Sequence, residues 1–289
     1  MHKKKNQPAL PAAAAAAASE IVDECELPLI DLRPLILAGG SAEEREKCKT
    51  EMARASEEWG FFQVVNHGVS PEILDRMRRE QVKAFKQPFD RKKEEDDSAI
   101  EQFATTVADL AQKLAGILAE KYLGRKSTFF QDNCAPSTCY LRMNRYPPCP
   151  MPPAAAVFGL MPHTDSDFLT ILYQDDQVGG LQLVKDGKCF AVKPNPQALI
   201  VNIGDLFQAW SNGVYKSVEH RVVTNPHVER FSTAYFFCPS YDTEIESRCE
   251  PSIYRKFSFK EYRQQVQEDV GKLGRKVGLS RFTVNAIYS

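Results

Sequence analysis

The sequence predicts a mixed α and β fold: a jelly-roll core, known as a double-stranded β-helix, flanked by N-terminal, central and C-terminal helices. Two observations predict it. From Cys139 onward, short apolar runs alternate with Gly, Pro and Asn breaks, which favours a closed or double-layered antiparallel fold over alternating βα units. Before that point, apolar residues recur at helical spacing. With 289 residues, 43% of them hydrophobic, the chain can form one large domain.

The first 26 residues are expected to be a disordered, Ala-rich tail. MHKKK followed by the run Ala12–Ala18 imitates the basic and apolar regions of a signal peptide. Asn6, Pro8 and Pro11 interrupt this pattern, and alanine is only weakly hydrophobic. A low-complexity tail is therefore the better interpretation.

Residues 27–123 are expected to form an N-terminal region of strands and helices. Ser41 can cap one helix, and Pro71 suits the first turn of another. The longest helix has an apolar stripe at helical spacing: Phe103, Val107, Leu110, Leu114 and Leu118. In chain order we expect a strand, a helix, a strand and two helices: Leu27–Asp31, Glu43–Glu58, Phe61–Val65, Pro71 towards Phe85, and Ile100–Leu123.

Residues 137–241 are expected to form the jelly-roll core. Gly-Gly, Asp-Gly and Asn-Gly pairs supply turns between eight short strands. These strands are Cys139–Tyr146, Gly159–His163, Leu169–Tyr173, Leu181–Val184, Cys189–Val192, Leu199–Ile203, Ser217–Val223 and Ser232–Phe237. Residues 242–289 are expected to form a helical extension packed on the core, with a helix over Phe259–Val277.

Three residues form a candidate metal site. His163 and Asp165 are two positions apart, and on a β-strand such residues point to the same face, so both could reach one ion. His220, on a later strand, would complete a two-histidine, one-carboxylate face. This face is typical of non-haem Fe(II), with positions left open for a co-substrate and O2. Taken alone, His220 would more simply be a core histidine bonded to the backbone.

Arg230 and Ser232 are candidates for binding an anion. They share one face of a strand that looks buried, and a buried arginine needs an anionic partner. The planar guanidinium can hold a carboxylate through two hydrogen bonds, and the serine hydroxyl can add a third. Tyr146 offers a further hydroxyl, although an aromatic residue at a strand end is nearly as good an interpretation.

Charge and cysteine usage exclude several classes. The 37 basic and 38 acidic residues leave a net charge of −1, which implies neither a nucleic-acid partner nor a membrane partner. No apolar stretch reaches the roughly 20 residues of a membrane-spanning helix. The eight cysteines contain no CxxC pair, so a zinc ribbon or a disulfide framework is not indicated. Reduced thiols point to a cytoplasmic location, with the nucleus as a second compartment.

Several motifs together resemble the plant Fe(II)/2-oxoglutarate-dependent dioxygenases. The N-terminal motifs are LPLIDL and WGFFQVVNHGV, and the resemblance extends from Leu27 to Phe282. Within that family, the sequence is most similar to gibberellin 2-beta-dioxygenases that act on C20 gibberellins. The motifs of the core are NRYPPCP, GLMPHTDSDFLTIL, GGLQL, NIGD, SNGVYKSVEHRV and RFSTAYFFCPS.

The resemblance implies a role for each candidate residue. His163, Asp165 and His220 would be the Fe(II) ligands, and Arg230 and Ser232 would bind the distal carboxylate of 2-oxoglutarate. Tyr146 and Asn144 would line the co-substrate pocket, whereas His67 in VNHG would be structural. O2 would be the oxidant, ascorbate would support activity, and the substrate would be a small gibberellin-like diterpenoid acid. The implied reaction is 2-beta-hydroxylation, which inactivates a hormone.

The sequence also departs from the family. Members are usually several tens of residues longer, and here the charged stretch Asp90–Asp97 passes directly into Ser98. The family has strands there that form part of the substrate wall. Two alternatives therefore stay open: another plant 2-oxoglutarate oxygenase of specialised metabolism, or an oxygenase fold that binds its ligands but has lost turnover. The preference for C19 or C20 gibberellins and the oligomeric state also stay open.

Overall fold

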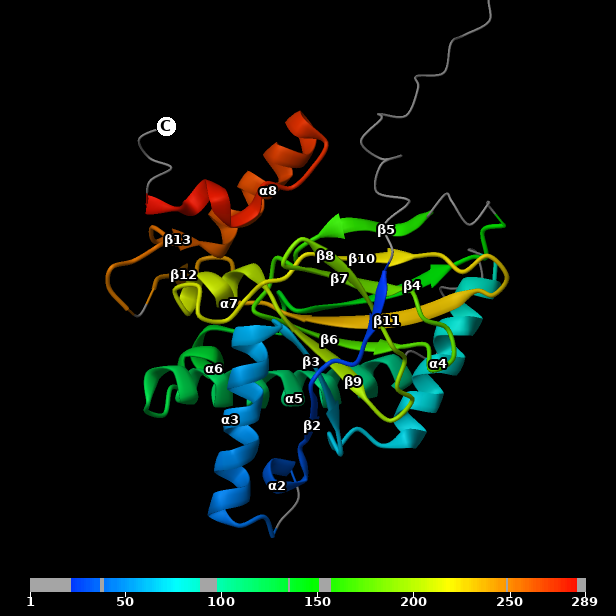
Figure 1. Ribbon diagram of the computed structural model, residues 1–289, viewed down its shortest axis with the longest axis horizontal. Coiled ribbons are helices and arrows are strands. Elements are labelled where there is room, and N and C mark those ends of the chain that lie inside the picture. Colours follow the sequence, from blue (N-terminus) through cyan, green and yellow to red (C-terminus); the bar gives the residue numbers. More distant parts are fainter. Residues whose placement is uncertain are drawn as a thin grey trace, which may run out of the picture.

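Two β-sheets face each other and form the centre of the molecule (Figure 1). The computed structural model describes residues 22–36, 39–88, 98–134, 136–150, 157–247 and 249–284. One sheet has five strands, in the order β1 (Asp23–Cys25), β8 (Lys188–Val192), β7 (Leu181–Lys185), β10 (His220–Val223) and β5 (Phe158–His163). The other has six, in the order β2 (Leu29–Asp31), β3 (Phe61–Val65), β9 (Leu199–Ile203), β6 (Leu169–Gln174), β11 (Arg230–Phe237) and β4 (Tyr140–Tyr146).

The expected jelly-roll core with flanking helices is confirmed. All eight strands predicted after Cys139 are present, and their ends differ by at most three residues from those expected. The largest difference is at β10, because residues 217–219 are not in a strand. The β11 strand is buried along its whole length, from Arg230 to Phe237.

The outer face of the six-stranded sheet is covered by the long helix α5 (Ser98–Leu123). The apolar stripe predicted for this helix is the face that it buries, and every member of that stripe is at most 4% exposed. Helices α3 (Ala42–Glu58) and α4 (Pro71–Lys86) pack against α5 towards its two ends (Figure 1). This layer supports β6 and β11 from behind, and those strands line the cavity between the sheets.

Local sequence signals explain where the helices begin and end. The Ser41 hydroxyl accepts a hydrogen bond from Glu44 N–H, and the Glu44 carboxylate accepts one from Ser41 N–H, which is a capping box. The Ser70 hydroxyl caps α4 by accepting from Ile73 N–H, with Pro71 in the first turn. Helix α8 (Phe259–Leu273) is shorter than predicted because Gly274 adopts a left-handed conformation, with φ of 71°, and ends it.

Some expectations for the fold are wrong in detail. The single strand expected at Leu27–Asp31 is shorter, and β1 precedes it. Two strand pairs, β1 with β8 and β2 with β3, are parallel, so the sheets are not wholly antiparallel. Six short elements were not expected: α2 (Arg33–Ile36), α6 (Phe129–Asn133), α7 (Asp205–Trp210), β12 (Glu244–Ile245), β13 (Phe257–Ser258) and the 3-10 helix η3 (Gly278–Phe282). The tail before Val22 and the Asp90–Asp97 stretch lie outside the described residues.

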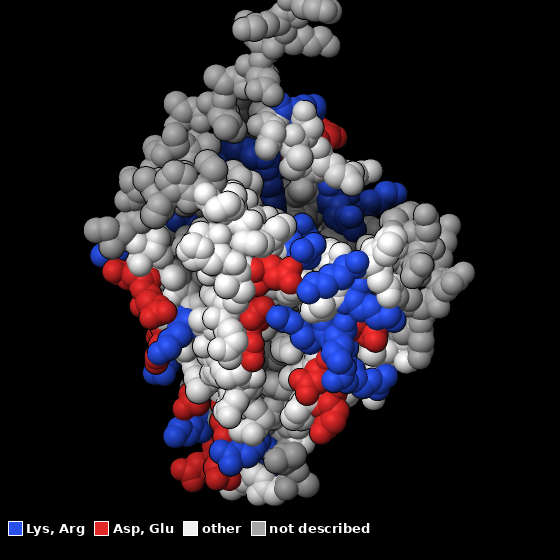
Figure 2. Space-filling view, turned by 90° about the vertical axis from the view of Figure 1, so that its right-hand side faces the viewer, with Lys and Arg blue, Asp and Glu red and all other residues white. Residues whose placement is uncertain are grey.

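Acidic and basic side chains are intermixed on the face that carries α4 (Figure 2). Glu229 contacts both Lys86 and Arg145, at 3.3 and 2.9 Å, and Lys83 contacts Glu80 at 3.4 Å. Lys83, Lys86 and Arg145 therefore each have an acidic neighbour. Among the described residues, no helix combines the length and the apolar character that crossing a bilayer requires.

Candidate metal centre and anion pocket

A narrow cavity lies between the two sheets and contains every predicted site residue. Its free space is about 50 Å³. Strands of both sheets and the loop after β5 contribute side chains to its walls: Phe61, Arg142, Asn144, Tyr146, Leu160, His163, Asp165, Thr170, Leu172, Leu181, Asn202, His220, Val222, Arg230, Ser232, Ala234 and Phe236. Polar groups therefore converge in a cavity whose remaining walls are apolar, as expected of a ligand site.

Strand register brings the two histidines together. His163 on β5 and His220 on β10 are directly paired across the antiparallel ladder, and their ring centroids are 4.3 Å apart. Asp165 Oδ1 lies 3.6 Å from His163 Nε2 and 3.8 Å from His220 Nε2. One ligand atom from each residue fits within 4.8 Å of the others. Residues far apart in the chain thus form one compact donor set.

The protonation of each imidazole follows from its hydrogen bond. His163 Nδ1 is 2.7 Å from the carbonyl oxygen of Met161, and His220 Nδ1 is 3.1 Å from that of Val218. Because a carbonyl oxygen only accepts, Nδ1 carries the proton in both rings. Burial, together with the nearby His220, lowers the pKa of His163 to about 4, so this ring is neutral at physiological pH. In both rings Nε2 is therefore the nitrogen that faces the Asp165 carboxylate, where a metal ion could be coordinated.

Asp165 reaches the histidines from a loop, not from the strand that we expected. Strand β5 ends at His163, so the two-residue periodicity of a strand does not position Asp165. Its Oδ2 instead accepts hydrogen bonds from Thr170 Oγ1 (2.7 Å) and Asn202 Nδ2 (2.8 Å). Thr170 and Asn202 are themselves paired across β6 and β9. They occupy Oδ2 and leave Oδ1 facing the histidines.

The ionised form of Asp165 is favoured despite its burial. Burial alone would raise the pKa of this carboxyl, but His220, His163 and the hydrogen bonds from Thr170 and Asn202 lower it by more. The pKa therefore lies below its ordinary value, and the site supplies one anionic oxygen beside the Nε2 atoms of two imidazoles.

Arg230 is the least exposed of the polar residues that line the cavity. It is 1% exposed, and its Nη2 donates to Gln174 Oε1 at 2.9 Å. Its Nε and Nη1 are buried and have no hydrogen-bond partner among the described residues. A guanidinium stays protonated in proteins, so these two donors require an anionic acceptor. A carboxylate from a ligand fits this requirement.

The neighbours of Arg230 follow from the pairing of β11 with β4. Arg230 is opposite Tyr146, and Ser232 is opposite Asn144, so all four side chains face the cavity. The Tyr146 ring lies 5.4 Å from the guanidinium carbon, and Asn144 Nδ2 is 3.5 Å from Ser232 Oγ. The Tyr146 ring also contacts Gly159 so closely that a Cβ there would overlap it. Gly159 thus leaves the space that Tyr146 occupies.

Another buried carboxylate, that of Asp205, connects the loop that contains Asp165 to the C-terminal segment. Its Oδ2 accepts from Thr164 Oγ1 (3.1 Å) and from the Tyr262 hydroxyl, and it pairs with Lys276 Nζ at 2.7 Å. Its Oδ1 accepts from Ser217 Oγ at 2.6 Å. Lys276 Nζ also donates to Thr164 O and Ser166 Oγ, at 2.9 and 2.8 Å. The residues on both sides of Asp165 are therefore held from outside the cavity.

The donor set fits Fe(II), and the anion pocket fits a dicarboxylate co-substrate. Two imidazole nitrogens and one carboxylate oxygen on one side of the metal are the ligands that non-haem Fe(II) takes when its other positions are left open.

Sequence reasoning identified the site residues but missed the residues that orient them: Thr170, Gln174, Asn202, Asp205 and Lys276. Asn202 and Asp205 belong to the NIGD motif, which was the available signal. Thr170 belongs to the GLMPHTDSDFLTIL motif, whereas Gln174 and Lys276 carried no distinguishing pattern.

His67, which was expected to be structural, lies outside this cavity. It is 7% exposed, and its Nδ1 accepts a hydrogen bond from Val69 N–H at 3.2 Å.

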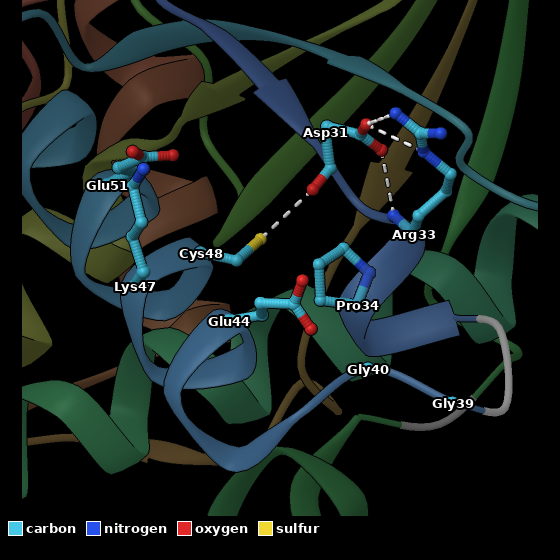
Figure 3. Close-up of a pocket in the computed structure, with 9 residues that line it drawn as sticks. All are labelled: Asp31, Arg33, Pro34, Gly39, Gly40, Glu44, Lys47, Cys48 and Glu51. Atoms are coloured by element: carbon cyan, nitrogen blue, oxygen red, sulfur yellow. Dashed lines mark hydrogen bonds and ion pairs between the residues drawn. The ribbon is translucent and has the colours of Figure 1, made fainter.

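A wider cavity of about 510 Å³ lies elsewhere, between α2 (Arg33–Ile36) and the start of α3 (Figure 3). Arg33 folds back onto Asp31, with Nη2 2.5 Å from Oδ2, and Cys48 Sγ contacts Asp31 O at 3.3 Å. Glu44 belongs to the capping box of α3. Asp31, Arg33 and Glu44 in the wall of this cavity therefore already have partners.

Comparison with known proteins identifies related sequences. Residues 137–239 match the family model described as the 2OG-Fe(II) oxygenase superfamily. Residues 27–152 match that of the non-haem dioxygenase in morphine synthesis N-terminal region. Gibberellin 2-beta-dioxygenase 8 of Arabidopsis thaliana is 56% identical, with 93% of this chain and 90% of the relative covered. Gibberellin 2-beta-dioxygenase 6 of Oryza sativa subsp. japonica is 44% identical, with 90% and 85% covered.

Two solved structures are similar to the whole fold. The crystal structure of JOX2 in complex with 2OG, Fe and JA has a TM-score of 0.73 and 29% identity, covering 89% of this chain and 93% of that one. The dioxygenase for auxin oxidation in rice has a TM-score of 0.72 and 29% identity, covering 89% and 100%. The alignment with the Arabidopsis relative spans 310 positions, more than the 289 residues of this chain. That relative therefore contains residues that this chain lacks.

We predict that Lys276→Met lowers the free energy of unfolding by about 2–4 kcal/mol, because it leaves the buried Asp205 carboxylate without its cation. Urea denaturation measures this change. Lys272→Met is the matched control, since Lys272 is 73% exposed in its pair with Glu268 and should cost less than about 1 kcal/mol. Equal losses in the two variants would contradict the role given to Lys276.

Proposed function

Because this chain belongs to the 2-oxoglutarate- and Fe(II)-dependent oxygenase superfamily, we propose that it hydroxylates gibberellins at C-2 on the β face. The reaction would inactivate these growth hormones. The observation that carries the proposal is the 56% identity, over 93% of the chain, with a gibberellin 2-beta-dioxygenase. The compact set of His163, Asp165 and His220 supports the oxygenase part of the proposal independently.

In this proposal, His163, Asp165 and His220 would hold Fe(II), with the two Nε2 atoms and Asp165 Oδ1 as donors. Bound Fe(II) supplies redox chemistry in which O2 oxidatively decarboxylates 2-oxoglutarate to succinate and CO2 and adds one oxygen atom to a C–H bond of the substrate. The protein contributes geometry. Thr170 and Asn202 fix the carboxylate, and the Nδ1–H groups of the histidines donate to backbone carbonyls, so the donor atoms are oriented before the metal binds.

Arg230 would bind the distal carboxylate of 2-oxoglutarate through Nε and Nη1, the two donors that lack a partner in the described structure. Ser232 would add a hydroxyl to that carboxylate, and Tyr146 and Asn144 would line the co-substrate. With its distal carboxylate bound by Arg230, 2-oxoglutarate would direct its other carboxylate and its keto oxygen towards the metal position. The apolar walls, including Leu181 and Val222, exclude water from the reacting atoms.

The shape of the cavity is compatible with a bulky substrate. The free space between the sheets is about 50 Å³, so a polycyclic skeleton would lie at the mouth with only its reacting edge near the metal. The residues that the gibberellin-named relative has and this chain lacks would contribute to that mouth. Uncoupled turnover, in which succinate forms without hydroxylated product, is therefore the measurable sign of an incomplete substrate wall.

We further propose a cytoplasmic location. The eight cysteines all lie within the described segments and are free thiols, which supports a reducing compartment.

The direct test is product analysis. The protein is loaded anaerobically with Fe(II) and 2-oxoglutarate, mixed with a panel of C19 and C20 gibberellins, and exposed to O2. We expect a product heavier by one oxygen atom, with the hydroxyl located at C-2 by NMR, in amounts matching the succinate formed. Jasmonic acid, indole-3-acetic acid and a flavonoid precursor complete the panel. Hydroxylation of one of these instead of any gibberellin would replace the proposed substrate while retaining the oxygenase.

The metal assignment predicts that His220→Ala abolishes Fe(II)-dependent formation of succinate from 2-oxoglutarate, because one of three donor atoms is lost. Enzyme-coupled succinate detection measures this. His67→Ala is the matched control, since His67 is buried but lies outside the cavity. Turnover retained in His220→Ala would refute the assignment.

The co-substrate assignment predicts that Arg230→Lys weakens 2-oxoglutarate binding by about 10- to 100-fold while Fe(II) binding is largely kept, because lysine retains the charge but loses the planar fork. Anaerobic calorimetric titration measures each ligand separately. An unchanged affinity for 2-oxoglutarate would contradict this role for Arg230.

A further inference from the structure

We propose that Gln81 on α4 is a positioning residue for the co-substrate, because its side chain holds the strand pair that presents Asn144 and Ser232 to the cavity. This inference rests on the proposed function, which assigns these two residues to 2-oxoglutarate. Gln81 is 1% exposed and does not itself line the cavity. It can therefore act on the site only through the residues that it contacts.

The Gln81 amide bridges two strands. Its Nε2 donates to the backbone oxygen of Ser232 on β11 at 2.7 Å and to that of Asn144 on β4 at 3.2 Å. A side-chain NH2 group has two protons, so one can go to each oxygen. Ser232 and Asn144 are directly opposite each other in the ladder. Gln81 thus joins both members of one residue pair, and both side chains of that pair line the cavity.

Gln81 reaches this pair from the outer face of the six-stranded sheet. Arg78 and Phe85 lie three residues before it and four residues after it, on the same face of α4. Both contact the ring of Phe231: the guanidinium carbon of Arg78 is 5.0 Å from the ring centroid, and the two phenylalanine centroids are 6.2 Å apart. Phe231 directly precedes Ser232 on β11, so its side chain points to the opposite face, away from the cavity.

A bridge at this place matters because β4 is an edge strand. Among the described residues, β4 pairs with β11 alone. A strand that is held on one side is less constrained than a central strand. The position of Asn144 depends on that of β4, and its Nδ2 is 3.5 Å from Ser232 Oγ. We expect loss of the Gln81 bridge to loosen the spacing of these two side chains while the strands stay paired.

An ion pair fixes α4 beside the Arg230 end of the cavity. Arg78 Nη2 lies 2.6 Å from Asp175 Oδ2, and Asp175 is 3% exposed. Asp175 directly follows Gln174, whose Oε1 accepts a hydrogen bond from Arg230. One face of α4 therefore supports both the partner of Arg230 and the strand pair that Gln81 bridges.

The test measures co-substrate affinity in Gln81→Met, which keeps the length of the side chain but removes both N–H donors. We expect the dissociation constant of 2-oxoglutarate, from anaerobic calorimetric titration of the Fe(II)-loaded protein, to rise by about 3- to 10-fold, because two hydrogen bonds that position its binding groups are lost. The KM for 2-oxoglutarate in succinate formation should rise equally, whereas kcat and the affinity for Fe(II) should stay unchanged. A merely unstable variant would contain less active protein, which lowers kcat and leaves the KM unchanged.

Gln63→Met is the matched control. Gln63 on β3 is also a buried glutamine, 6% exposed, and its Nε2 donates to the backbone oxygen of Lys193 at 3.4 Å, but it does not line the cavity. This control should leave the KM for 2-oxoglutarate unchanged. If Gln81→Met does not fold, Gln81→Asn, whose amide is one methylene too short to bridge the two oxygens, should show the same selective rise.

Ser232→Ala separates this inference from its premise. It should weaken 2-oxoglutarate binding by itself, and the further effect of Gln81→Met should be smaller in the Ser232→Ala background, because Gln81 acts partly through that hydroxyl. An unchanged KM for 2-oxoglutarate in Gln81→Met, or an equal rise in Gln63→Met, would overturn the inference. If Ser232→Ala and Asn144→Ala both leave 2-oxoglutarate binding unchanged, the assignment made in the proposed function fails, and the inference fails with it. That outcome is distinct because it appears in variants that keep Gln81.

Discussion

The site depends on one buried carboxylate whose two oxygens have separate tasks. Asp165 Oδ2 is occupied by Thr170 and Asn202, so only Oδ1 faces the two imidazole nitrogens. One donor atom from each of His163, Asp165 and His220 lies within 4.8 Å of the others, so a single cation could contact all three. The protein keeps them together because β5 and β10 are paired in a register that sets His163 opposite His220.

The same sheets separate the tasks of binding and reaction along the cavity. The ladder between β11 and β4 carries Arg230 opposite Tyr146 and Ser232 opposite Asn144. His163 and His220 come from the opposite sheet, and Asp165 comes from the loop after β5. The loop itself is held from outside by Asp205 and Lys276, so the C-terminal segment is part of the support of the site. Helix α5 covers the outer face of the six-stranded sheet and stabilises this frame.

Much of this could be predicted from the sequence. Alternating apolar runs and turn residues indicated all eight core strands, and the stripe from Phe103 to Leu118 indicated the helix behind them. The candidate site residues could be named because they belong to recognisable motifs. The orienting roles of Thr170, Gln174 and Lys276 could not, since these residues act through tertiary contacts. Thr170 belongs to a recognisable motif, but its hydrogen bond to Asp165 is a consequence of the fold. The expected strand position of Asp165 was wrong for the same reason: its placement is set by hydrogen bonds from β6 and β9, not by strand periodicity.

The central claim, that two imidazoles and one carboxylate converge on a single Fe(II), is tested most directly by X-ray absorption spectroscopy of the anaerobic Fe(II)-loaded protein. We expect scattering from two imidazole ligands in the wild type, and from one in His163→Ala if that variant still binds iron. A wild-type spectrum without histidine scattering, or an identical spectrum in the iron-loaded variant, would contradict the account.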